Sequence, residues 1–193
     1  MFSFPDKFGM ILESYKYEKN QAKAAVVELI TYTLEVGGAQ SLAEMIGWLR
    51  LPPENVNQDI VEKNFPIVSA PKGSREITLF RFKAKDDTPA SQQCIAKLMH
   101  EMTKEEILDI MKQFEKRAAG IDELIALGVK LPEIRDALIP TALGSVAFIN
   151  GLEKAVCLSN ASRTKHLDAP CLSTISVPGP WSAEFIFAAV SSF

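Results

Sequence analysis

The side chains best suited to nucleophilic chemistry in this chain of 193 residues lie near its carboxyl end: His166, Asp168 and Cys171. A thiolate activated by an imidazole, which a carboxylate in turn orients, is a common arrangement for covalent catalysis. Catalytic groups of this kind usually come from separated segments that the fold brings together. These three residues instead crowd into one short stretch, so we expect the chain not to be an enzyme.

Sulfur and nitrogen ligands for a metal ion occur at Cys157, His166 and Cys171, and again at Cys94 with His100. Structural zinc sites show tightly paired spacings such as C-x-x-C, and the sequence contains no such pair. The glycine-rich motifs that bind phosphate, G-x-G-x-x-G and G-K-[ST], are missing as well. We therefore expect neither a metal ion nor a cofactor.

Polar side chains that could contact nucleic-acid bases cluster in the segment Glu54–Lys63. Amide side chains can pair with base edges, and the segment carries Asn55, Asn57 and Gln58. Basic residues that could contact phosphates follow it: Lys72, Arg75, Arg81 and Lys83. The segment also carries three acidic residues, which a polyanion would repel. Binding of nucleic acid would thus depend on a local basic patch.

The segment Trp181–Phe193 is strongly apolar. It carries aromatic side chains of the kind that anchor interfaces: Trp181, Phe185, Phe187 and Phe193. Two interpretations stay open. The segment either packs on the core of its own chain as a final helix or strand, or it forms an arm that docks on a neighbouring copy or on another protein. The second interpretation predicts a homo-oligomer or a protein partner.

Composition indicates a soluble globular protein. Apolar residues make up 47% of the chain and charged residues 23%, and the net charge is −3, so no bulk attraction to nucleic acid or to an acidic membrane is expected. No apolar run is long enough to span a bilayer, and the first residues do not resemble a signal peptide. The three cysteines suit a reducing compartment. We expect a cytoplasmic protein that does not bind membranes.

Two helices are predicted before residue 52. Apolar residues at helical spacing predict the first over Asn20–Val36, with Gly37-Gly38 as its stop. Ser41 opens the second and stands in capping-box relation to Glu44. Pro52-Pro53 ends it, because proline disfavours the helical conformation of the residue before it.

A third helix over Glu54–Lys63 and two strands, Phe65–Ser69 and Glu76–Lys83, complete the first unit. This order of helix, turn, helix and hairpin resembles a winged helix-turn-helix fold. The resemblance implies that Glu54–Lys63 is a helix that contacts bases, and that the hairpin is a basic wing.

The remainder is predicted to be helical after a polar linker at Ala84–Pro89. The expected helices include Ser91–Met102, Ile121–Leu127, Pro132–Leu138 and Thr141–Leu158. One further helix is expected between the first two: a Thr103/Glu106 capping box opens it and Gly120 closes it.

The sequence therefore predicts a mainly α protein with a small β-hairpin, an α+β fold. Its units are a winged-helix-like unit at 1–85, an all-α helical unit at 86–158, and a loop-rich segment with an apolar tail at 159–193. The function expected is that of a non-enzymatic regulatory protein that binds nucleic acid. The alternative is a protein-interaction module, such as an adaptor or an inhibitor from a phage, plasmid or pathogen.

Overall fold

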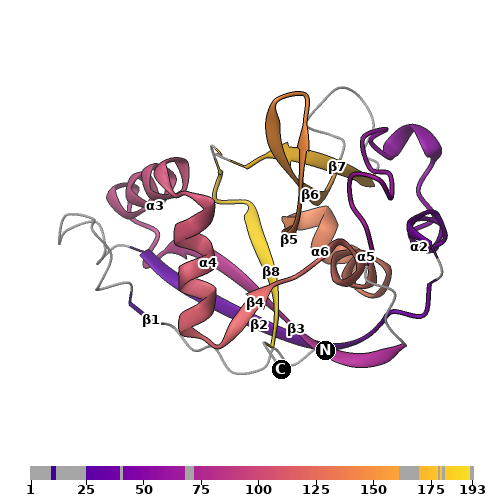
Figure 1. The fold of residues 1–193 in the computed structure, drawn as a ribbon. Coiled ribbons are helices and arrows are strands. Elements are labelled where there is room, and N and C mark those ends of the chain that lie inside the picture. The colour runs from indigo at the N-terminus through magenta and orange to yellow at the C-terminus, as the bar shows by residue number, and fades with distance from the viewer. Residues whose placement is uncertain are drawn as a thin grey trace.

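A single mixed β-sheet organises the computed structural model, which describes residues 10–11, 25–39, 41–67, 72–160, 170–177, 179 and 181–191. Seven strands follow one another across the sheet in the order β1-β2-β3-β8-β5-β6-β7, and the short β4 also pairs with β8 (Figure 1). All neighbours are antiparallel except β5 and β8. The predicted mainly α fold, with its winged-helix-like unit and all-α helical unit, is therefore wrong.

The strands are β1 Met10–Ile11, β2 Ala25–Val36, β3 Gly73–Ala84, β4 Lys116–Ala118, β5 Ile139–Ile149, β6 Leu152–Asn160, β7 Pro170–Ser176 and β8 Phe185–Ser191. The described residues also form five α-helices and a 3-10 turn: α2 Leu42–Trp48, η1 Pro53–Asn55, α3 Pro89–Glu101, α4 Lys104–Gln113, α5 Ile121–Lys130 and α6 Pro132–Ala137. Strands from all three predicted units thus share one sheet.

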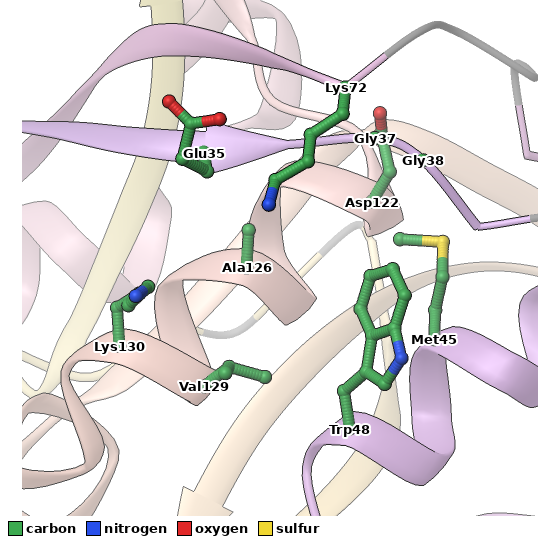
Figure 2. Close-up of a pocket in the computed structure, with 10 residues that line it drawn as sticks. All are labelled: Glu35, Gly37, Gly38, Met45, Trp48, Lys72, Asp122, Ala126, Val129 and Lys130. Carbon is green, nitrogen blue, oxygen red and sulfur yellow. The ribbon is translucent and has the colours of Figure 1, made fainter.

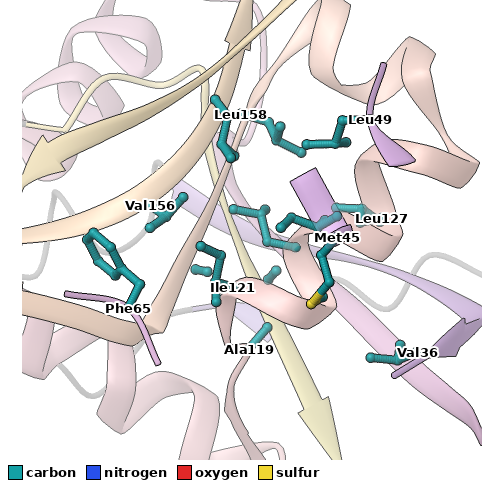
Figure 3. Packing of buried hydrophobic residues seen from close by; sticks show 14 of the residues in the cluster. Val36, Met45, Leu49, Phe65, Ala119, Ile121, Leu127, Val156 and Leu158 are labelled. Carbon is teal, nitrogen blue, oxygen red and sulfur yellow. The ribbon is translucent and has the colours of Figure 1, made fainter. Parts of the chain in front are cut away.

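Helices cover both faces of the sheet, and each face has its own hydrophobic core. The first core lies beneath α2, α5 and α6 (Figure 3), and the second lies beneath α3 and α4. Successive strand residues point to opposite faces, and β3 follows this rule: Ile77 and Leu79 enter the first core, while Phe80 and Phe82 enter the second. Both faces of the central strands are therefore buried.

The predicted helix over Asn20–Val36 is instead strand β2 where the structure describes it. Its residues pair one by one with those of β3, from Ala25 opposite Ala84 to Val36 opposite Gly73. Most side chains in β2 are β-branched or aromatic, and such residues favour strands. The helical spacing of its apolar residues arose because β2 contributes to both cores.

The predicted base-contacting helix over Glu54–Lys63 is also absent. Only the 3-10 turn Pro53–Asn55 forms, and the chain continues through turns to Phe65. Asparagine side chains stabilise these turns. The Asn57 carboxamide oxygen accepts a hydrogen bond from the Asp59 N–H, and the Asn64 amide donates one to the Asp59 carbonyl. Such bonds compete with helical hydrogen bonds. The expected partner strand Phe65–Ser69 does not form over its described part, and β3 pairs with β2 and β8 instead.

The predicted helix over Thr141–Leu158 is the β5–β6 hairpin. Asn150 and Gly151 form its turn with φ angles of 52° and 81°, the left-handed values that a two-residue hairpin requires. An Asn-Gly pair between two apolar runs is a strong hairpin signal, and it outweighs the helical spacing of the apolar residues around it.

Local signals correctly predicted several other elements. The Ser41 hydroxyl caps α2 by accepting a bond from the Glu44 N–H. The Thr103/Glu106 capping box opens α4, although α4 ends at Gln113 and residues 116–118 form β4 rather than further helix. The helices expected over Ser91–Met102, Ile121–Leu127 and Pro132–Leu138 correspond to α3, α5 and α6.

Candidate functional site

A pocket of about 280 Å³ opens where α2 and α5 face the end of β2 and the start of β3 (Figure 2). We refer to it as the Trp48 pocket. Its lining residues are Glu35, Gly37, Gly38, Met45, Trp48, Lys72, Asp122, Ala126, Val129 and Lys130. They come from four segments of the chain: 35–38, 45–48, Lys72 and 122–130.

Two large apolar side chains at this pocket are accessible to solvent. Trp48 is 40% exposed and Val129 is 39% exposed, and both lie at the same pocket. In α2, Leu42, Met45 and Leu49 face the first core. Trp48 lies beside this buried stripe, so its indole ring is presented to the pocket (Figure 2).

Two lysines give the pocket a positive side. Figure 2 shows the Lys72 side chain extending over α5, while Lys130 stands at the end of that helix. Gly38 adopts a φ of +87°, and a Cβ there would lie 3.2 Å from the Cβ of Lys72, so this glycine makes room for the lysine stem. Among the described residues, neither lysine has a carboxylate within 4 Å.

The acidic residues at the pocket are less available to a ligand than the lysines. Asp122 already lies 3.7 Å from Arg75. Burial and the neighbouring charge of Glu123 raise the pKa of Asp122, so its charged form is disfavoured. Glu35 is exposed at the rim, and Figure 2 shows its carboxylate directed away from Trp48. The free charge facing a ligand is therefore mainly that of the two lysines.

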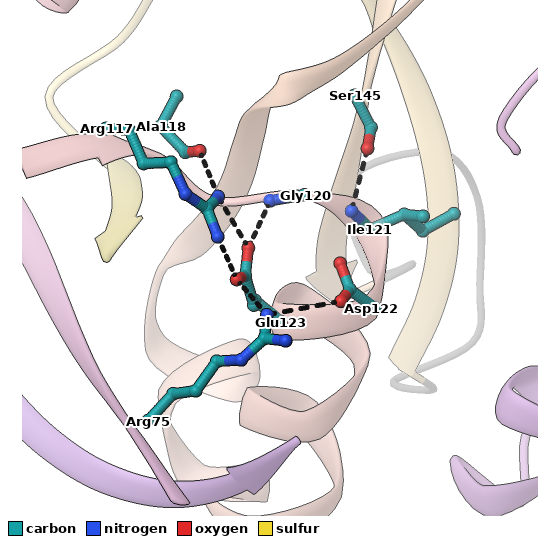
Figure 4. A network of polar contacts seen from close by, with 8 residues as sticks. All are labelled: Arg75, Arg117, Ala118, Gly120, Ile121, Asp122, Glu123 and Ser145. Atoms are coloured by element: carbon teal, nitrogen blue, oxygen red, sulfur yellow. Dashed lines mark hydrogen bonds and ion pairs between the residues drawn. The ribbon is translucent and has the colours of Figure 1, made fainter. Parts of the chain in front are cut away.

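The buried carboxylate of Glu123 fixes the start of α5 (Figure 4). Its Oε1 atom accepts bonds of 2.7 Å from both Arg75 and Arg117, and its Oε2 atom accepts a bond of 2.6 Å from the Gly120 N–H. Burial acts to raise the pKa of Glu123, but the bonds from Arg117 and Gly120 outweigh burial and hold that pKa below its ordinary value. Glu123 thus joins β3, β4 and α5.

A bulge in β5 supports the same helix end. The register with β6 shifts between Ala142 and Val146, and within this shift Gly144 and Ser145 contact the start of α5. There the Gly144 N–H donates to the Ala119 carbonyl, and the Ser145 hydroxyl accepts from the Ile121 N–H. Ser145 and Glu123 thus satisfy the Ile121 and Gly120 N–H groups at the start of α5, which would otherwise lack partners. The pocket wall that α5 provides is accordingly rigidly placed.

The amides predicted to contact bases have structural partners. The Asn55 side chain donates to the Pro170 carbonyl, and the Asn57 side chain donates to the Thr174 hydroxyl. Through these bonds the segment after η1 covers the outer edge of β7. Gln58 lies exposed in a turn. The helix expected to present all three does not form, and nucleic-acid binding by them stays a prediction.

The predicted basic residues divide between two places along β3. Lys72 lines the Trp48 pocket and Arg75 bonds to Glu123. Arg81 and Lys83 lie toward the other end of β3 and share Glu28, at 3.9 Å and 3.1 Å. They line a second, polar hollow of about 380 Å³ together with Lys85, Asp86 and Asp87. The fold therefore does not gather these residues into one patch.

The apolar carboxyl-terminal segment packs on its own chain. Trp181 is 2% exposed, and Phe185 and Phe187 of β8 are buried. The rings of Trp181 and Phe187 meet edge to face. Of the two interpretations, burial on the chain's own core holds for the described part. Phe193 lies outside the described residues, and partner binding by this segment stays a prediction.

The residues considered for chemistry do not assemble into a described site. Burial and the nearby Cys171 raise the pKa of Cys157 to about 12, so its thiol stays protonated. Cys171 contacts the hydroxyl of Ser159, while His166 and Asp168 lie outside the described residues. Within the ranges that the structure describes, no three His, Cys, Asp or Glu side chains are grouped to hold a metal ion, and no helix is long and apolar enough to cross a membrane.

Comparison with protein-family models, with curated proteins and with solved structures finds no match to this chain. Sequence reasoning did not select Trp48, Val129 or Lys130 as site residues. No local motif could have joined them, because the pocket forms only when α5 packs beside α2.

We expect Glu123→Gln to lower the free energy of unfolding at neutral pH by about 1.5–3 kcal/mol, because a charge-assisted bond network is lost at a buried position. The pKa of Glu123 is lowered by folding, so its contribution is complete above the ordinary value of 4.5. That contribution disappears as the pH falls through the lower native pKa. Urea unfolding at pH 7 and at acid pH measures the difference.

Glu76→Gln is the matched control, because Glu76 is about half exposed and pairs with Lys116 at the surface. It should change stability by less than about 0.5 kcal/mol. If Glu123→Gln changes the free energy of unfolding at pH 7 by no more than Glu76→Gln does, the carboxylate of Glu123 does not hold α5 in place.

Proposed function

We propose that this chain is a non-enzymatic protein-interaction module, and that its Trp48 pocket takes an apolar side chain lying next to a carboxylate in a partner protein. The observation that carries the proposal is the exposed indole of Trp48 beside two lysines, neither of which has a carboxylate within 4 Å in the part of the chain that the structure describes. Exposed tryptophan is the type of residue that most often dominates binding energy at protein interfaces.

The size of the pocket allows a side-chain anchor. Pockets that enclose small organic ligands usually measure about 300–1,000 Å³, and the Trp48 pocket, at about 280 Å³, lies close to the lower limit of this range. One aromatic or large aliphatic side chain fits into such a space. Trp48, Val129, Met45 and Ala126 supply the apolar contact for it.

The charges around the pocket favour an acidic neighbour for that side chain. Lys72 and Lys130 offer ammonium groups, whereas the carboxylate of Asp122 faces Arg75 and has a raised pKa. An anionic ligand group therefore gains more than a cationic one. The attraction that exposed lysines exert weakens as the salt concentration rises. The preference for an anionic over a cationic ligand group should therefore weaken as well.

A dipeptide probe tests this proposal. Acetyl-Asp-Phe-amide should change the tryptophan fluorescence with a dissociation constant of roughly 5–80 mM, because burying one side chain yields only about 1.5–3 kcal/mol. Acetyl-Lys-Phe-amide should bind at least about fivefold more weakly. The signal comes from Trp48, because Trp181 is buried, and Trp48→Phe should abolish it.

Lys72→Glu should reverse the preference between the two dipeptides, whereas Lys97→Glu, on the exposed side of α3, should leave it unchanged. Equal binding of both dipeptides, or no response that depends on Trp48, would contradict the proposal.

Nucleic-acid binding is a second candidate function, now without a winged helix. The observation that favours it is the second hollow, where Arg81, Lys83 and Lys85 lie together and the Arg81 Nε atom is buried with no partner among the described residues. It ranks second because Glu28, Asp86 and Asp87 offset these cations.

If this second candidate holds, a labelled DNA duplex should bind at low salt. Arg81→Ala combined with Lys83→Ala should then weaken binding and flatten its dependence on salt, because fewer counterions are released. A gel shift measures both. No shift at low salt removes this candidate.

A further inference from the structure

The β5–β6 hairpin ends in an apolar tip. Phe148 is 75% exposed and Leu152 is 50% exposed, on either side of the Asn150–Gly151 turn. These are the two most exposed large hydrophobic residues among those the structure describes. Figure 1 shows the hairpin projecting beyond the helices that cover the rest of the sheet. We refer to residues 148–153 as the hairpin tip.

The hairpin tip places an aromatic ring beside a carboxylate. Phe148 stands directly opposite Glu153 in the register of β5 and β6. Residues opposite each other in an antiparallel pair share a face, with Cβ atoms about 4.5–5.5 Å apart. The tip therefore presents the combination that the Trp48 pocket is proposed to take.

We infer that the hairpin tip of one copy occupies the Trp48 pocket of a second copy of this chain. The inference rests on the proposed function and names its partner. The tip is not seated in the pocket of its own molecule, because no residue of the tip lines that pocket and Phe148 is largely exposed. The tip is therefore free to contact a second copy.

Charge complementarity supports this occupant. Glu153 accepts a bond of 2.9 Å from Lys104, yet its side chain stays 49% exposed. A carboxylate has two oxygens and can accept further donors. When the Phe148 ring lies against Trp48, the ammonium groups of Lys72 and Lys130 stand at the same pocket as this carboxylate. Trp48 and Phe148 are also suited to pair as aromatic rings.

The tip and the pocket are different surfaces, so the contact is heterologous. Each copy in such a contact keeps one free tip and one free pocket, and assembly continues until a ring closes or a filament grows. Because the tip offers few side chains, we expect weak association that rises with concentration rather than a permanent dimer.

Two variants with complementary defects test the inference. Phe148→Asp removes the aromatic ring of the tip and leaves the pocket intact. Trp48→Ala removes the indole of the pocket and leaves the tip intact. Both positions are exposed, so each variant should keep the circular dichroism spectrum of the wild type. The wild-type mass in analytical ultracentrifugation should rise with concentration, and each variant alone should stay monomeric.

An equal mixture of the two variants should form dimers and nothing larger, because only one tip and one pocket are intact. Val61→Asp is the matched control: Val61 is 46% exposed and lies outside both surfaces, so this variant should assemble like the wild type. Assembly of Phe148→Asp alone, or a mixture that stays monomeric, would overturn the inference.

A monomeric wild type would overturn the inference as well. The dipeptide probe separates this failure from failure of the proposed function. If the wild type stays monomeric while acetyl-Asp-Phe-amide still changes Trp48 fluorescence, self-association is wrong and the interaction module stands. If neither is seen, both are wrong.

Discussion

Burial of the strand β8 on both faces is the constraint on which the rest of the structure depends. Its alternate side chains fill two cores, with Phe185, Phe187 and Ala189 in one and Ile186, Ala188 and Val190 in the other. Such a strand is stable only inside a sheet with helices on both sides. β8 lies between β3 and β5, so the last segment of the chain joins elements formed by the first and middle parts.

The position of the proposed pocket follows from β8 through a short series of contacts. The Ala119 N–H donates to the Ala188 carbonyl of β8, which fixes the residue before the α5 cap. Glu123 then ties the first turn of α5 to β3 and β4 through its two arginines. With its start held, α5 carries Ala126, Val129 and Lys130 to the wall facing Trp48. Sheet pairing thus determines the geometry of a surface site.

Local signals made parts of this structure predictable from sequence. The Thr103/Glu106 capping box and the proline at the start of α6 lie at the elements they define, so the starts of α4 and α6 are predicted correctly, although α4 ends well before the predicted stop at Gly120. β2 was mispredicted because its apolar residues serve two cores and so imitate helical spacing, and β5–β6 because a long apolar run obscured the Asn150-Gly151 turn. The pocket depends on contacts between distant segments, which spacing along the chain does not reveal.

The central claim, that Trp48 marks a binding surface for another copy, can be observed directly in the protein as it is. The two tryptophan indole N–H groups give two resonances in a nitrogen–proton correlation spectrum, and Trp181 serves as an internal control because it is buried in the second core. When the protein concentration is raised, the Trp48 resonance should shift or broaden while the Trp181 resonance stays in place. A Trp48 resonance that does not change over the whole concentration range would show that Trp48 does not bind another copy.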